Sequence, residues 1–100
     1  MYNVLITPLV SDILIDYARR FALDNGIECA NKFTDSFDHA VESLTEIPQR
    51  GVRKLKYIPS RYRIIPFWKH LWLVYQIDEN AKEVYVDFLI DDRSDYGKIF

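Results

Sequence analysis

The sequence has 100 residues, 49% hydrophobic and 28% charged, so we expect one packed domain over residues 1–100 rather than a disordered chain. Its longest apolar runs, such as Leu71 to Tyr75, are too short to span a bilayer, and no secretory signal is visible, which predicts a cytoplasmic protein. The single cysteine, Cys29, excludes an internal disulfide, and we expect it to be a small buried hydrophobe on a helix.

The formal net charge of −2 conceals a segregated charge pattern. Residues 1–46 and 78–100 are both acidic, whereas residues 47–77 contain no acidic side chain. The basic side chains of this middle stretch, called the basic segment below, are Arg50, Arg53, Lys54, Lys56, Arg61, Arg63 and Lys69. Interleaved with aromatic residues, they indicate a docking surface for phosphates or an acidic protein. The alternative is a solvated loop and a protected edge strand.

A short strand and a helix are predicted at the N-terminus. Residues 2–6 are rich in β-forming side chains. A helix then begins at Thr7, which suits an N-cap, and Pro8, whose missing N–H costs nothing in the first turn. The helix ends at Asn25 and Gly26, where glycine provides the left-handed cap. Its apolar stripe comprises Val10, Leu14, Tyr17, Ala18 and Phe21.

A second helix follows and closes before Pro48 and Gly51. Its apolar stripe comprises Ala30, Phe33, Phe37, Ala40, Val41 and Leu44. A link of two or three residues between the helices predicts an antiparallel hairpin.

Three strands are predicted in the second half, over residues 61–67, 71–77 and 84–90, with a turn at 78–81. The expected order is β-α-α-β-β-β. This is an α+β fold in which the helical hairpin packs on one face of a small, mainly antiparallel sheet. The other face, or the groove beside the helices, remains partly open for a large partner.

Few residues indicate small-molecule chemistry. His70, just before a strand, is either a proton carrier or a hydrogen-bonded structural residue. Asp91, Asp92 and Asp95 flank Arg93, which favours salt bridges over acid–base catalysis. The sequence has no glycine-rich phosphate loop, no nucleophile triad and no metal-ligand spacing, so we expect no cofactor and no metal.

A series of motifs runs through the chain in a fixed order. It comprises the stretches 6–22 and 40–51, then Tyr62-Arg63, Ile65-Pro66, His70 and the apolar residues 73–77, and a strand ending at 89–95. Together these resemble the RelE/ParE superfamily of bacterial toxins from type II toxin–antitoxin systems. Asp91 stands where histidine is usual. The resemblance implies the α+β fold derived above, a growth-inhibiting toxin and a neutralising antitoxin partner.

One branch that the resemblance brings in, the RelE-like branch, consists of ribosome-dependent endoribonucleases that cut messenger RNA. Cleavage activates the ribose 2′-hydroxyl against the adjacent phosphate, which requires a base and charge stabilisation. The residues implied for that role are Arg63, His70, Arg93 and Tyr96. Two further basic strand positions of that branch fall on Ile65 and Trp72, which do not fit.

Members of the ParE-like branch poison DNA gyrase and lack the nuclease residues. The Ile65-Pro66 pair and the sequence at the end of the last strand, residues 91–95, favour this branch. In that branch the toxin is not an enzyme and forms a hetero-oligomer with a partly disordered, acidic antitoxin. The residues then expected to contact the target or the antitoxin are Arg53, Lys54, Lys56, Arg61, Arg63, Trp68, Lys69 and Arg93. A degenerate member that binds only its antitoxin is the third possibility.

Overall fold

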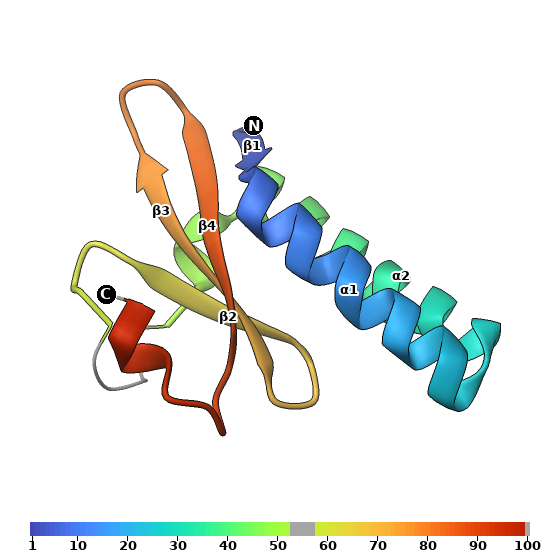
Figure 1. Ribbon diagram of the computed structural model, residues 1–100. Helices are drawn as coiled ribbons and strands as arrows, with labels where there is room; N and C mark the ends of the chain where they lie inside the picture. Colours follow the sequence, from blue (N-terminus) through green and yellow to red (C-terminus); the bar gives the residue numbers. More distant parts are fainter. Residues whose placement is uncertain (53–57, 100) are drawn as a thin grey trace.

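The computed structural model describes residues 1–52 and 58–99. Its elements are β1 (Asn3–Ile6), α1 (Pro8–Asn25), α2 (Ile27–Glu46), the 3₁₀ turn η1 (Pro48–Arg50), β2 (Arg63–Trp68), β3 (Leu71–Asp78), β4 (Glu83–Asp91) and the 3₁₀ turn η2 (Tyr96–Ile99). The predicted order β-α-α-β-β-β is therefore confirmed. Figure 1 shows α1 and α2 side by side on one side of the sheet, with η2 on the other.

The sheet is mixed, with the strand order β1-β4-β3-β2. β2, β3 and β4 form the predicted antiparallel meander, but β1 pairs parallel with β4. A parallel pair needs a long connection between its two strands. Here the helical hairpin, β2 and β3 all lie between β1 and β4 in the chain. The last strand thus lies inside the sheet, and β1 and β2 form its two edges.

Local chemistry fixes both ends of α1. Thr7 is its N-cap, with Oγ1 accepting from the backbone N–H of Val10 at 3.4 Å, and Pro8 occupies the first turn. The expected link of two or three residues is wrong, because a single residue, Gly26, separates the helices. Its φ of 92° lies in the left-handed region, which lets one glycine reverse the chain.

The larger core lies between the helices and the sheet. Its fully buried side chains include those of Phe33, Leu44, Leu73 and Tyr75. The expectation of a buried Cys29 is only partly met, because this free cysteine is half-buried.

A smaller core covers part of the opposite sheet face, called the open face below. Its buried members are Tyr62, Ile64, Val74 and Ile90. Trp72, Phe88 and Tyr96 pack against them, so η2 closes a portion of the face that the sequence left open. Within the part of the chain that the structure describes, no helix is long and apolar enough to cross a membrane.

Candidate functional site

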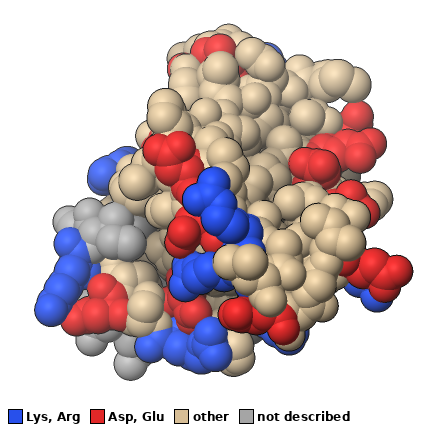
Figure 2. All heavy atoms as spheres, turned by 45° about the vertical axis from the view of Figure 1, so that its right-hand side comes forward, with Lys and Arg blue, Asp and Glu red and all other residues tan. Residues whose placement is uncertain are grey.

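The described members of the basic segment do not form one patch. Arg50 follows the end of α2, Arg61 lies in the turn before β2, Arg63 begins β2, and Lys69 lies in the turn beyond its end. Arg53, Lys54 and Lys56 fall outside the described residues. Figure 2 shows one face of the molecule, on which basic side chains gather in the lower half with acidic side chains among them.

Arg63 is committed to the backbone. Its Nη1 donates to the carbonyl oxygens of Gln49 and Gly51, at 3.2 Å and 3.0 Å, which ties the start of β2 to the turn after α2. The buried phenol of Tyr75 donates to the carbonyl of Pro48 at 2.5 Å in the same region. Burial raises the pKa of this phenol above its ordinary value. Arg63 therefore has a structural role here.

Two of the other residues predicted to contact a partner, Arg61 and Trp68, instead contact aromatic rings of this chain. The Arg61 guanidinium lies 4.7 Å from the ring centroid of Tyr62. Trp68 packs edge-on against Phe33, with ring centroids 5.5 Å apart, and this half-buried ring belongs mainly to the helix-side core. Lys69 is exposed, with a positive φ of 36° that the tight β2–β3 turn imposes.

His70 and Asp92 form a pair at the far end of β2. The Nδ1 atom of His70 lies 3.0 Å from Oδ1 of Asp92, and Trp72 Nε1 donates to the other carboxylate oxygen at 3.0 Å. The backbone N–H of Asp92 also donates to the carbonyl of His70 at 2.9 Å. The imidazole, whose side chain is 50% exposed, is thus oriented by a carboxylate and has its Nε2 free among the described residues.

Arg93 forms the salt bridge expected from the sequence. Its guanidinium donates twice to Asp91, at 3.1 Å and 2.8 Å, and its backbone N–H donates to the same carboxylate. These hydrogen bonds hold the pKa of Asp91 below its ordinary value and raise that of Arg93. Arg93 thus closes the turn after β4.

The four residues implied for RNA cleavage are not gathered around one point. Arg63 and His70 lie at opposite ends of β2, about 20 Å apart along an extended strand. Arg93 lies near His70, since Asp91 and Asp92 are adjacent, whereas Tyr96 packs into the open-face core. The structure therefore brings His70 and Arg93 together and leaves Arg63 apart.

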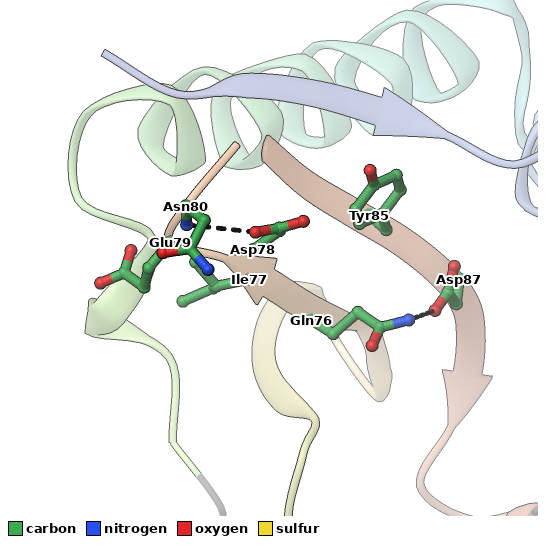
Figure 3. A pocket seen from close by; sticks show the side chains of 7 residues that line it. All are labelled: Gln76, Ile77, Asp78, Glu79, Asn80, Tyr85 and Asp87. Carbon is green, nitrogen blue, oxygen red and sulfur yellow. Dashed lines mark hydrogen bonds between the residues drawn. The ribbon is translucent and has the colours of Figure 1, made fainter. Parts of the chain in front are cut away.

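A hollow of about 630 Å³ lies on the open face near the tip of the β3–β4 hairpin (Figure 3). Asp78, Glu79 and Asp87 line it, with Asp87 accepting from Gln76 at 2.7 Å and Glu79 from Tyr2 at 2.6 Å. The hydrogen bond from Tyr2 lowers the pKa of Glu79. The sequence did not predict this hollow. The pairing of β3 with β4 shifts register between Val74 and Tyr75, and this β-bulge changes which side chains of β4 share a face.

These carboxylates do not form a metal site. Asp87 and Glu79 already accept hydrogen bonds, and in the ranges 1–52 and 58–99 no cluster of three His, Cys, Asp or Glu side chains has the arrangement to hold a metal ion. The hollow is open to solvent and acidic.

Comparisons with known proteins agree with this fold. A family model described as "ParE toxin of type II toxin-antitoxin system, parDE" matches residues 4–96. A solved structure titled "Chromosomal ParDE TA system from P. aeruginosa" has a similar fold, with a TM-score of 0.74 and 15% sequence identity. The match covers 91% of this chain and 96% of that chain. No curated protein sequence matches.

Proposed function

Because the chain belongs to the ParE toxin family of type II toxin–antitoxin systems, we propose that it inhibits bacterial growth by binding DNA gyrase in the cytoplasm. On this proposal a cognate antitoxin neutralises it by forming a hetero-oligomer with it. The toxin acts as a binding protein and not as an enzyme, and it needs no cofactor.

One observation carries the choice of a binding protein over a nuclease. Arg63 matches a basic strand position of the ribonuclease branch. Its guanidinium donates hydrogen bonds to the carbonyls of Gln49 and Gly51 and is therefore not available to a phosphate. The other two such positions hold Ile65, which is buried, and Trp72, which donates to Asp92. A cleavage site needs several charged groups converging on one phosphate.

The test is a pair of assays on the purified protein. We expect it to inhibit supercoiling by gyrase and to leave a message intact on translating ribosomes. A finding that gyrase works normally at saturating toxin, while induced expression still arrests growth, would overturn the choice of target.

The ribonuclease alternative is favoured by one feature, the His70–Asp92 pair. A carboxylate that orients an imidazole is the arrangement used by many general bases. If this pair catalyses cleavage, message cut on ribosomes should disappear in His70→Gln and fall strongly in Asp92→Asn, with both variants folded. Intact message with the unmodified protein excludes this alternative.

A further inference from the structure

A groove follows the free edge of β2, between that strand and α2. Its floor is apolar and buried, since Ile65 and Phe67 are 4% and 9% exposed. The main part holds about 320 Å³ and is lined by Ser36, His39, Ala40, Ser43, Arg50, Ile65, Pro66 and Phe67. An adjoining hollow of about 370 Å³ continues along Pro66, Phe67, Trp68 and Lys69. We call the two together the β2-edge groove.

The outer wall of the β2-edge groove is one stripe of α2. Ser36, His39, Ala40 and Ser43 recur at helical spacing, so their side chains share a face. Lys32 lies one turn before Ser36 and extends the same stripe. The acidic residues of α2 fall on neighbouring stripes and line neither hollow.

The charges along the groove have one sign. Arg50 lies at one end and Lys69 at the other, and no acidic side chain is among the described residues that line either part. Neither cation has an ion-pair partner within residues 1–52 and 58–99. The groove thus combines unpaired positive groups with an apolar floor, which suits a segment that is both acidic and apolar.

The backbone of β2 restricts how such a segment can bind. Ile64 exchanges two backbone hydrogen bonds with Val52, at 3.0 Å and 2.9 Å, so this stretch of the edge is already covered. The next residue whose backbone faces outward is Pro66, which has no N–H to donate. A ladder of backbone bonds cannot continue past it. At Pro66 only the carbonyl can accept a backbone hydrogen bond, so a partner must be held mainly by side-chain contacts.

We propose that the β2-edge groove binds a short, extended, acidic segment of a protein partner. Four to six residues would span it, because the strand from Ile65 to Lys69 covers about 13–17 Å. Acidic side chains pair with Arg50 and Lys69, and alternate apolar side chains contact Ile65 and Phe67. If the function proposed above holds, the segment belongs to the antitoxin.

A protein segment fits this groove better than a nucleic acid does. A nucleic-acid strand carries a charge on every nucleotide and needs a continuous basic track. Here the basic groups span only the short groove, and the exposed acids Asp35 and Asp38 lie on the adjoining surface of α2. A nucleic-acid strand longer than the groove would pass over these acids and be repelled by them, whereas a segment of four to six residues ends within the groove.

The probe is a fluorescein-labelled peptide, Glu-Leu-Asp-Ile-Glu-Leu, whose binding to the full-length protein is followed by fluorescence polarisation. We expect Arg50→Glu and Lys69→Glu each to weaken binding by about three- to tenfold, since each replaces an attraction by a repulsion. Raising the salt from about 25 mM to about 250 mM NaCl should weaken binding by a similar factor because exposed charges are screened.

Arg19→Glu is the matched control. It changes the net charge equally but lies in a different hollow, which shares no lining residue with either part of the groove. We expect unchanged peptide binding. Amide chemical shifts of the ¹⁵N-labelled unmodified protein provide a readout independent of any variant, with peptide-induced changes expected at Ser36, His39 and Phe67.

The proposal is overturned if the peptide does not bind, if Arg19→Glu weakens binding as much as Arg50→Glu, or if the shift changes lie elsewhere. Tighter binding of a twelve-nucleotide single-stranded RNA than of the peptide would assign the groove to nucleic acid. These measurements use neither gyrase nor cells, so their failure leaves the growth-arrest test of the proposed function unaffected, and the reverse holds too.

Discussion

Gly51 lies where the chain leaves η1, and no side chain fits at this position. A Cβ atom placed on it would lie 2.0 Å from the Tyr75 hydroxyl oxygen and 3.1 Å from Cβ of Arg63. Tyr75 is fully buried and its hydroxyl holds the carbonyl of Pro48, so the ring has no room to retreat. The residue is required by packing and not by its backbone angles, since its φ of −64° is ordinary.

We expect Gly51→Ala to lower the free energy of unfolding by about 2–3 kcal/mol, because overpacking forces the Tyr75 hydroxyl or the turn to move. Urea unfolding measures the loss. In the background of Tyr75→Phe, which removes the clashing oxygen, the same substitution should cost clearly less. Equal costs in both backgrounds would show that the clash is not the cause.

Asp91 and Arg93 make stability depend on pH in the acid range. The hydrogen bonds from Arg93 lower the pKa of Asp91 in the folded protein, while the unfolded chain retains the ordinary value of about 3.9. The folded carboxyl therefore binds fewer protons than the unfolded one. The stabilisation is present above that ordinary value and is lost as the pH falls through the lower, folded value.

Arg93→Gln should therefore flatten this acid dependence. We expect a smaller drop in the urea midpoint between about pH 6 and about pH 2.5 than in the unmodified protein, and the difference is small because Arg93 is largely exposed and the ion pair is screened by solvent. In an Asp91→Asn background the substitution should leave the pH dependence unchanged. An undiminished slope in Arg93→Gln would contradict the assignment.

At the scale of single elements, β2 is an edge strand whose outer side is guarded. Val52 covers Ile64, and Pro66 removes the next outward N–H. Its neighbour Phe67 is buried against α2, so the strand is apolar on its inner face. An apolar strand with a free edge would be a template for pairing with another chain.

Pro66→Val restores the outward N–H on an apolar residue, and we expect it to increase self-association at matched protein concentration. Light scattering and size-exclusion chromatography measure it. Pro66→Lys restores the same N–H with a charge and should remain closer to the unmodified protein. If both variants aggregate alike, lost stability rather than the edge is responsible.

The sequence predicted these elements well where its signals are local. Thr7 and Pro8 marked the start of α1, and a density of aromatic and β-branched residues marked the three strands of the meander. The predicted length of the link between the helices was too large. One residue, Gly26, suffices because its φ of 92° reverses the chain, and the sequence does not reveal that angle. The parallel pairing of β1 with β4 follows from packing between distant segments, which no local pattern records.

Site residues were harder to predict than elements. Charge alone cannot show that Arg63 binds carbonyls of the adjacent turn, or that His70 is oriented by Asp92 from another strand. The β2-edge groove combines one stripe of α2 with one strand edge, and its parts are separated by the residues of η1 and the following segment. The basic segment correctly indicated the region but not which of its cations are available.

At the scale of the whole molecule, one sheet carries a core on each face. Trp68 packs against Phe33 in the helix-side core, whereas Trp72 packs with the open-face core and donates to Asp92. The two faces share β3, whose side chains alternate between them. Each tryptophan is thus a reporter of one face.

We expect both faces to unfold in one step. Fluorescence of Trp72→Phe, which retains Trp68, and of Trp68→Phe, which retains Trp72, should each give an unfolding curve that coincides with the loss of far-UV circular dichroism in the same variant. The midpoints of the two variants can differ, so each is compared with itself. A fluorescence transition that precedes the loss of secondary structure in one variant would show that its face melts independently.

The pairing of β1 with β4 also determines when the sheet can be completed during synthesis of the chain. Asn3 pairs with Glu83, so the first strand must wait for nearly the whole chain before it finds its neighbour. Contacts between such distant residues slow folding, and the helical hairpin that emerges first has an unsatisfied apolar face. A nascent chain that ends before Glu83 therefore lacks the partner strand of β1, and its helical hairpin has no complete sheet to pack on.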